Sequence, residues 1–321
     1  MTAERLDAFM ARANAAYYAT HNPFADFTTS PEIGQVFGEV LGLWAALVWE
    51  SMGRPDPVLL VEAGPGRGTM MADALRAAAV LPGFSEAVRV HLIEASPSLR
   101  AEQALRVPGA VWHDDFASLP PGPMILLANE FLDALPIRQF FYAADGWRER
   151  WVEGGAFVER PTDRDWPGVP GDIREVGEAA LAWTAALAAR LATEGGAALI
   201  LDYGPAQSGP GDTLQALRHG APGDPLAEPG EADLTAHVDF SALAKAAAPP
   251  AAVHGPLPQG VFLARLGLFQ RTAALTAAAP HRGGALATAA HRLTAPEAMG
   301  RLFKALAICH PDLPLPPGFA P

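Results

Sequence analysis

The sequence predicts an α/β fold built around an open, mostly parallel, Rossmann-like sheet. Short apolar runs recur along the chain, and most are followed by a turn and a stretch of helical length. Strands that alternate with helices in this way are typical of parallel sheets, whose strands are buried on both faces. A glycine-rich turn between one strand and the next helix marks the place where such sheets bind a ligand.

Composition indicates a folded, acidic protein of 321 residues. Half of the residues are apolar, which is enough for a sizeable core and excludes global disorder. Lys and Arg number 23 against 35 Asp and Glu, a net charge of −12. This balance argues against nucleic acid as a partner and favours a cationic one. The single cysteine, Cys309, excludes an intramolecular disulfide and a cysteine metal cluster.

Nothing in the sequence predicts membrane insertion or export. The apolar stretch at 36–49 is too short for a bilayer and carries Glu39. The first ten residues hold Glu4 and Asp7 and no apolar signal core. We therefore expect a soluble cytoplasmic protein, and its alanine- and arginine-rich composition is typical of GC-rich bacterial coding.

The first part of the chain predicts N-terminal helices and then the strands of the sheet. Helices are expected over 3–18 and 31–50, with a loop over 22–31 between them. Ser30 is suited to cap the second helix and Pro31 to its first turn. Buried strands are expected at 58–61, 88–93, 110–112 and 124–128, with a helix at 69–79.

The pattern changes after Pro136. Residues 138–160 alternate around turn signals at Asp145–Gly146 and Gly154–Gly155, which predicts an inserted antiparallel β meander. The expected elements after it are a helix at 174–193, a strand at 197–201, a surface loop over 205–232, a helix at 240–248 capped by Asp239, broken helices over 258–300 and a strand at 302–308. The predicted division is a helical cap at 1–50 and a core at 51–321, with a β and helical lobe inserted at about 136–196 and a loop insert at about 205–235.

The glycine-rich turn follows the strand at 58–61, in the segment EAGPGRGT. Glycine lets the backbone turn tightly and lets a ligand approach closely. Gly64, Gly66 and Gly68 are spaced G-x-G-x-G rather than in the G-x-G-x-x-G of dinucleotide folds, which suits a nucleoside without a pyrophosphate. Glu62, two residues before the first glycine, is placed to face a cationic group, and a sulfonium with an α-amino group fits.

Acids also follow the next two strands. Glu94 comes 26 residues after Gly68, where an acid accepts hydrogen bonds from both ribose hydroxyls. Asp115 is placed to meet an adenine amino group. Simpler readings remain open, because Glu94 or Ser96 can cap the next helix and Asp114 is an equal candidate beside Asp115. Three acids at successive strand ends are the S-adenosylmethionine pattern of class I methyltransferases. The predicted cofactor-binding residues, including a lid near residue 30, are Thr29, Glu32, Glu62, Gly64, Pro65, Gly66, Gly68, Glu94, Ala95, Asp115 and Phe116.

The sequence resembles the MidA-like methyltransferases over nearly its whole length. The matching segments are FTTSPEIGQVFGE at 27–39, VEAGPGRGT at 61–69, NEFLDALPIRQF at 129–140, LDYG at 201–204, GEADLTAHVDF at 230–240 and LFKALAI at 302–308. The resemblance implies a Rossmann-like core that uses S-adenosylmethionine. The family includes a mitochondrial protein-arginine methyltransferase that assists complex I assembly, which implies symmetric dimethylation of an arginine on a complex I subunit.

Carboxylates after the fourth strand are the predicted catalytic groups. Glu130 and Asp133 are three residues apart and are expected to share a helical face, with Asn129 as a polar orienter. Carboxylates hold a guanidinium by bidentate contacts and draw its charge toward the far nitrogens. Either acid can instead cap a short following helix. Tyr203, after the strand at 197–201, is expected to line the acceptor pocket.

Other chemistries find no support in the sequence. It has no G-x-S-x-G and no P-loop motif, and its nine histidines are scattered, so no metal site is expected. The predicted function is methyl transfer to a protein substrate with an exposed arginine, with a homodimer left open. The alternatives are a methyltransferase of a small molecule and an assembly chaperone that binds the cofactor with little catalysis. The glycine spacing disfavours a nicotinamide enzyme.

Overall fold

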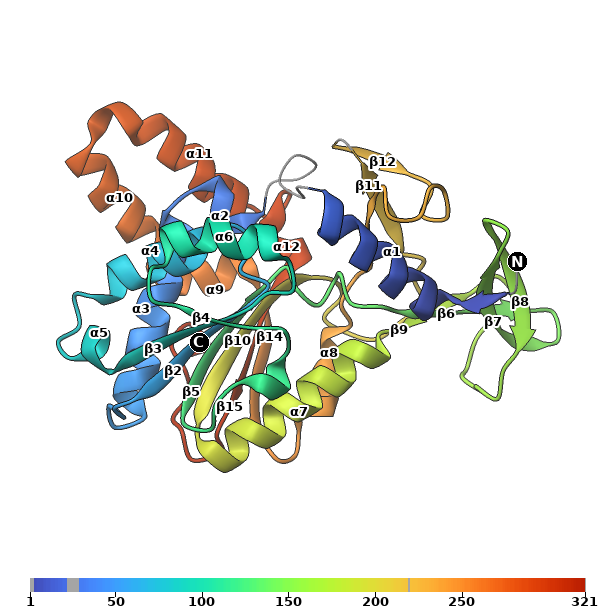
Figure 1. Cartoon of the computed structure of the whole chain (residues 1–321), viewed down its shortest axis with the longest axis horizontal. Coiled ribbons are helices and arrows are strands. Elements are labelled where there is room, and N and C mark those ends of the chain that lie inside the picture. The colour runs from blue at the N-terminus through green and yellow to red at the C-terminus, as the bar shows by residue number, and fades with distance from the viewer. Residues whose placement is uncertain (1–2, 22–28, 219, 321) are drawn as a thin grey trace.

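The computed structural model describes residues 3–21, 29–218 and 220–320. At its centre lies a seven-stranded sheet in the order β14-β15-β10-β5-β2-β3-β4 (Figure 1). The strands are β2 (Val58–Ala63), β3 (Val88–Ile93), β4 (Val111–His113), β5 (Met124–Asn129), β10 (Gly196–Tyr203), β14 (Ala252–Pro258) and β15 (Phe303–Cys309). The predicted α/β, Rossmann-like sheet is confirmed.

The order of the strands locates a crevice in this sheet. Strands β4, β3, β2, β5 and β10 pair in parallel, whereas β15 is antiparallel to both β10 and β14. The chain builds outward from β2 to β3 and β4, then returns to place β5 on the other side of β2. The carboxyl ends of β2 and β5 therefore flank the point where the strand order reverses, which is where open α/β sheets bind ligands.

Helices cover both faces of the central sheet. Strand β2 is buried along its whole length, because alternate side chains enter different hydrophobic clusters. Val58 and Leu60 join the cluster that contains α3 (Val36–Ser51) and α4 (Thr69–Ala78), and Leu59 and Val61 join the one that contains α7 (Glu178–Glu194) and α8 (Phe240–Ala247).

The remaining helical elements are shorter or lie toward the C-terminus. They are α5 (Phe84–Ala87), α6 (Pro97–Arg106), α9 (Gln259–Arg265), α10 (Leu268–Ala278), α11 (Gly283–Thr294), α12 (Met299–Leu302) and the 3-10 turns η2 (Phe116–Ser118) and η3 (Pro280–Arg282). Helices α10 and α11 form a hairpin at the upper left of Figure 1. The predicted broken helices at the C-terminus are confirmed, and so is Asp239, whose Oδ1 accepts the Ala242 N–H at the start of α8.

The predicted meander forms the middle of a second, antiparallel sheet, at the right of Figure 1. Its strands are β1 (Glu4–Arg5), β6 (Arg138–Ala143), β7 (Gly146–Glu153), β8 (Ala156–Pro161) and β9 (Ile173–Val176). A third sheet has the order β12-β11-β13. Its strands are β11 (Gln215–Arg218), β12 (Ala221–Gly223) and β13 (Asp233–Thr235).

Helix α1 (Leu6–Thr20) joins these two smaller sheets. Leu6, Phe9 and Met10 share a hydrophobic cluster with Val152 of β7 and Leu234 of β13. In Figure 1, α1 spans the distance between the central sheet and the second sheet. Helix α3 instead belongs to the central sheet's own core. The division into a cap at 1–50 and a core stays a prediction.

Three predictions of secondary structure are wrong. The helix expected at 31–50 is two helices, α2 (Ser30–Ile33) and α3, and Thr29 rather than Ser30 is the N-cap of the first. The helix expected at 174–193 begins only at Glu178, because residues 173–176 pair with β6 as a strand. The loop expected over 205–232 contains β11 and β12, which pair with each other, and β11 also pairs with β13.

Strands β1, β13 and β14 had no counterpart in the sequence prediction, and one predicted loop is mostly undescribed. Strand β1 has only two residues, and β14 contains Pro256 and Pro258 and an irregular register next to His254. Proline argues against a strand from sequence alone, but an edge strand with a bulge tolerates it. Residues 22–28 of the loop expected over 22–31 lie outside the described residues.

Candidate active site

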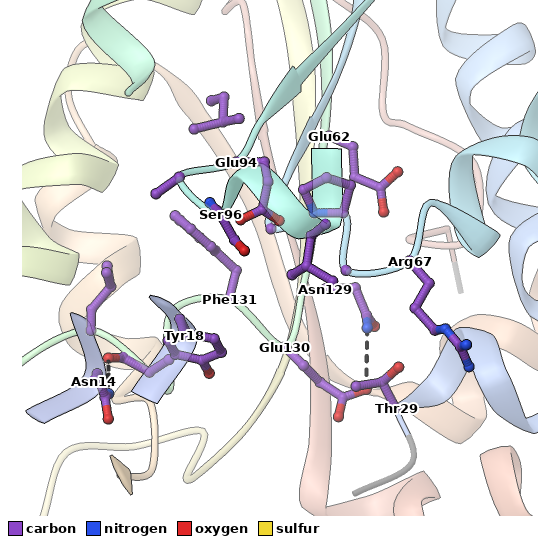
Figure 2. Close-up of a pocket in the computed structure, with 18 of the residues that line it drawn as sticks. Asn14, Tyr18, Thr29, Glu62, Arg67, Glu94, Ser96, Asn129, Glu130 and Phe131 are labelled. Carbon is purple, nitrogen blue, oxygen red and sulfur yellow. Dashed lines mark hydrogen bonds between the residues drawn. The ribbon is translucent and has the colours of Figure 1, made fainter. Parts of the chain in front are cut away.

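A cavity of about 620 Å³ opens at the carboxyl ends of the parallel strands. Its walls come from the turns after β2, β3, β4 and β5, from the start of α2, and from one face of α1 (Figure 2). The predicted site residues that line it are Thr29, Glu32, Glu62, Gly64, Pro65, Gly66, Glu94, Ala95, Asp115, Phe116, Asn129 and Glu130. Gly68 and Asp133 are not among the lining residues.

The glycine turn needs its glycines. Gly64, Gly66 and Gly68 have φ of +65°, +52° and +79°, the left-handed region that side chains disfavour. A Cβ on Gly64 would also lie 2.9 Å from Cδ2 of Phe131, in the turn after β5. Gly68 contributes indirectly, since it is the N-cap of α4 and its N–H donates to the Pro65 carbonyl at 2.7 Å. The turn therefore keeps the cavity open at its centre.

Glu62 is a buried acid with an unsatisfied oxygen. The residue is only 2% exposed, yet it lines the cavity at the end of β2. Its carboxylate accepts the backbone N–H of Met71, and Oε2 has no hydrogen-bond partner among the described residues. Burial raises the pKa of Glu62 to about 8. A cationic ligand group would complete this site, because a nearby positive charge stabilises the ionised carboxylate that burial disfavours.

Glu94 is held in place with acceptor capacity left over. Oε1 accepts the Ser96 N–H at 2.8 Å, and Oε2 accepts from Nε2 of Gln103 at 3.1 Å. Burial raises the pKa of this carboxyl. A carboxylate has about four lone-pair positions, so acceptor capacity stays available toward the cavity. Ser96 is the N-cap of α6, so the alternative in which Glu94 supports this helix start is also present in the structure.

The next turn carries two acids and an aromatic wall. Oδ1 of Asp115 accepts the Ser118 N–H at 2.9 Å, so this residue caps η2 while also lining the cavity. Asp114 lines it too and pairs with Arg100 at 2.5 Å. The rings of Phe116 and Phe131 lie 5.9 and 5.3 Å from that of Trp183, which gives the cavity an aromatic, apolar wall suited to a base.

Hydrogen bonds tie helix α2 to the segments that follow β2 and β5. The hydroxyl of Thr69 donates to Oε1 of Glu32 at 2.5 Å, which ties α2 to the start of α4. The backbone N–H and the hydroxyl of Ser30 both donate to Oε1 of Glu130 at 2.8 Å. Ser30 therefore positions a carboxylate. Thr29 lies beside these contacts and lines the cavity, at the lower right of Figure 2.

Glu130 follows β5 in an unusual conformation. Its φ is +49°, and non-glycine residues in this region often mark functional strain. Its Oε1 accepts from the two Ser30 groups and from Nδ2 of Asn129 at 3.1 Å. Burial raises the pKa of the Glu130 carboxyl. The carboxylate is therefore fixed by one oxygen at the wall of the cavity.

Asp133 lies behind this wall. The expected helix is wrong, because residues 131–136 form a turn whose backbone N–H groups point at Asp202. Asp133 is buried with a hydrogen bond to the Tyr203 side chain, and burial together with Asp202 raises its pKa. Tyr203, expected in the acceptor pocket, does not line the cavity.

Sequence reasoning missed several lining residues. They are Asn14 and Tyr18 of α1, Arg67 of the glycine turn and Trp183 of α7. Arg67 lies within a motif that was recognised, so its position was available. The others come from helices that carry no motif of their own, and their faces are revealed only by packing. The described residues hold no group of three or more His, Cys, Asp or Glu side chains arranged for a metal ion.

A sheet of this order with a nucleoside-sized cavity at its reversal point defines the class I methyltransferases that use S-adenosylmethionine. Comparison with protein families agrees. A family described as S-adenosyl-L-methionine-dependent methyltransferase matches residues 40–257, and the chain belongs to this MidA-like family. It is thus a methyltransferase whose cofactor is S-adenosylmethionine.

Named relatives and solved structures resemble most of the chain. Protein arginine methyltransferase NDUFAF7 homolog, mitochondrial, of Drosophila melanogaster is 34% identical over 95% of this chain and 80% of its own length. The NDUFAF7 protein of Xenopus laevis is 36% identical over 78% and 67%. A Burkholderia thailandensis crystal structure with bound S-adenosyl-homocysteine has a TM-score of 0.85 and 26% identity, covering 99% of this chain and 90% of that one.

These relatives correct one expectation. The sequence alone predicts a cytoplasmic location. The named relatives are mitochondrial proteins, so that prediction is wrong. The reasoning relied on residues near the start of the sequence, and such residues say nothing of segments outside it. In the described parts of the chain, no helix has the length and apolarity that a membrane crossing requires.

Proposed function

We propose that this protein transfers a methyl group from S-adenosylmethionine to a guanidinium nitrogen of a protein arginine. The observation that carries the proposal is the Glu130 carboxylate, fixed through Oε1 at the wall of the cofactor cavity. An acidic cavity wall suits a cationic acceptor, and the chain as a whole carries a net charge of −12. The names of the relatives support the same acceptor.

The cofactor-binding residues follow from the unsatisfied groups of the cavity. Glu62, with its free Oε2, would bind the cationic amino-acid end, and Glu94 would bind the ribose hydroxyls. The Phe116 ring and one of the neighbouring acids, Asp114 or Asp115, would hold the adenine. Gly64, Pro65 and Gly66 leave the space, and Thr29 with Glu32 closes it from α2.

In this reaction Glu130 binds and orients the acceptor arginine and then accepts its proton. The cofactor supplies an electrophilic methyl group, and the bond from its carbon to sulfur breaks as the bond to nitrogen forms. An arginine guanidinium stays protonated in proteins, so a carboxylate is needed to hold it and to draw its charge away from the nitrogen that reacts. The nitrogen then releases one proton. Burial raises the pKa of Glu130, which makes its carboxylate a better acceptor of that proton.

We propose supporting roles for the other two predicted catalytic residues, Asn129 and Asp133. Asn129 orients Glu130 through its side-chain amide. Asp133 lies outside the cavity, so we propose it as a positioning residue that acts through the turn after β5. A respiratory complex I subunit, implied by the family resemblance, is the proposed substrate. The proposed homodimer is tested by light scattering, where a monomer at assay concentrations would exclude it.

The decisive experiment is methylation of arginine peptides with labelled S-adenosylmethionine. We expect label on arginine and none on a matched lysine peptide. Glu130→Gln should bind the cofactor within about twofold of the wild type and lower kcat about 100-fold or more. Cofactor binding by the wild type without transfer to any arginine would instead favour the assembly-chaperone alternative.

A further inference from the structure

One face of α1 forms the wall of the cavity that the strand ends do not supply. The residues of this face that line the cavity are Ala11, Asn14, Ala15, Tyr18 and Ala19, which recur at helical spacing. Three of the five are alanine, so they leave room beside the helix. In Figure 2, Tyr18 and Asn14 lie in the lower part of the view with Glu130, whereas Glu62 and Glu94 lie in the upper part. The cavity thus has a cofactor end and an α1 end.

Asn14 fixes α1 over this end of the cavity. Its Nδ2 donates to the carbonyls of Leu234 at 2.8 Å and Ala134 at 3.0 Å, and its Oδ1 accepts the Leu234 N–H at 3.0 Å. Asn14 is only 6% exposed. One amide therefore joins α1 to β13 and to the turn after β5. The position of α1, and of Tyr18 one helical turn further on, is set by the same strand end that carries Glu130.

The Tyr18 hydroxyl uses its hydrogen in a bond within the protein. It donates to Oδ1 of Asp233 at 2.8 Å, and Asp233 is only 4% exposed. Burial and the nearby Asp233 charge raise the pKa of Tyr18 well above its usual value, so the hydroxyl stays protonated. With its hydrogen directed at Asp233, the oxygen can offer only lone pairs to the cavity.

We propose that Tyr18, oriented by Asp233, accepts an N–H from the methyl acceptor at the α1 end of the cavity. This inference rests on the proposed function and adds the selectivity of its site. A guanidinium carries five N–H donors and no acceptor, so it satisfies both Tyr18 and Glu130. A carbonyl oxygen in the same position would face the Tyr18 oxygen, and neither atom would have a hydrogen to donate to the other. Tyr18 therefore selects for a cationic, donor-only acceptor, whereas Glu130 binds the edge where chemistry occurs.

The test is Tyr18→Phe, which keeps the ring and removes the oxygen. S-adenosyl-homocysteine affinity should stay within about twofold, because Tyr18 faces the other end of the cavity. The KM for an arginine peptide should rise about tenfold or more, as expected for losing a hydrogen bond to a charged group. The control is Tyr142→Phe, in β6, whose side chain packs on Trp147 and does not line the cavity. It should leave KM unchanged.

A selectivity measurement separates this role from a merely structural one. A citrulline peptide replaces one guanidinium nitrogen by a carbonyl oxygen. We expect the ratio of citrulline to arginine peptide dissociation constants, measured on the protein loaded with S-adenosyl-homocysteine, to fall about tenfold in Tyr18→Phe. A structural defect would weaken both peptides equally. Asp233→Asn should also lower the ratio, because an amide can donate to Tyr18 and turn its proton into the cavity.

The outcomes distinguish this inference from the function on which it rests. If the wild type methylates arginine and Tyr18→Phe has unchanged KM and selectivity, the role of Tyr18 is refuted and the function stands. If the wild type binds S-adenosyl-homocysteine but neither binds nor methylates an arginine peptide, the proposed function fails and the role of Tyr18 fails with it. A raised KM together with lost selectivity supports both.

Discussion

Glu62 and Asp202 are two buried carboxylates at the ends of parallel strands, and they do different work. Each is at most 2% exposed, and burial raises the pKa of Glu62 to about 8 and that of Asp202 to about 7. Oδ2 of Asp202 accepts the N–H groups of residues 131–133 at 3.2, 2.9 and 3.3 Å, and Oδ1 accepts the Tyr203 N–H at 2.9 Å. Glu62 has one oxygen without a partner in the described structure.

The contrast between Asp202 and Glu62 separates a structural acid from a binding acid. Asp202 faces a turn that needs an anion, since three consecutive N–H groups converge on one oxygen. Glu62 faces a cavity and is left incomplete by the fold. Burial and pKa are similar at both positions, so neither property distinguishes them. The count of satisfied acceptor positions does, and it predicts loss of stability for one residue and loss of binding for the other.

Asp202→Ala should destabilise the fold strongly. Removing the carboxylate takes away the acceptor of four backbone N–H groups, those of residues 131–133 and of Tyr203, and the free energy of unfolding should fall by about 3 kcal/mol or more. Urea unfolding measures it, with exposed Asp165→Ala as a control expected to change it by less than about 0.5 kcal/mol. A loss as small as that of the control would mean that the turn after β5 holds its shape without Asp202.

Glu62→Gln should show the opposite behaviour. The amide keeps the size of the side chain and removes a buried charge that has no full set of partners, so the free energy of unfolding should not fall. The dissociation constant for S-adenosyl-homocysteine should rise about 30- to 100-fold, because a cationic ligand group loses its counter-charge. Titration calorimetry measures the binding. A stability loss as large as that of Asp202→Ala, with binding intact, would place Glu62 among the structural acids.

Glu94 stands between these two cases, since two of its acceptor positions are filled by the protein. Glu94→Ala should weaken S-adenosyl-homocysteine binding about tenfold through lost hydrogen bonds to the ribose hydroxyls. An analogue that lacks both hydroxyls should bind the wild type and the variant equally. Unequal binding of that analogue would show that Glu94 acts through the start of α6 instead. Exposed Glu86→Ala is the matched control.

The cofactor end of the cavity was predictable because its signals are local. The strand, the glycine turn and Glu62 lie within a few consecutive residues, and Glu94 and Asp115 each follow an apolar run. A parallel sheet aligns the ends of such runs without any further information. The same reasoning failed just after β5, where the turn at 131–136 depends on Asp202, about 70 residues later in the chain.

The α1 end was not predictable for the same physical reason. The hydrogen bond from Tyr18 to Asp233 joins residues 215 positions apart, and Asn14 reaches Leu234 across 220. Helix α1 carries no motif and reads as an ordinary amphipathic helix, and the family segment at 230–240 does not indicate that α1 is its partner. Strand β9 was likewise taken for helix, because its strand character comes from pairing with β6 rather than from its own composition. Long-range pairing decides these elements, and a single sequence does not contain it.

The last prediction, with the smallest change, is a pH dependence of binding that comparison with Glu62→Gln assigns to Glu62. In the empty protein its pKa is about 8, so it is mostly protonated at pH 7, and a bound cation would stabilise the charged form and release that proton. Affinity for S-adenosyl-homocysteine should therefore rise with pH up to about 8, by about fivefold between pH 7 and 8, and then level off. In Glu62→Gln the fivefold rise should disappear. An equal rise in the variant would assign the proton to another group, such as the ligand's own ammonium.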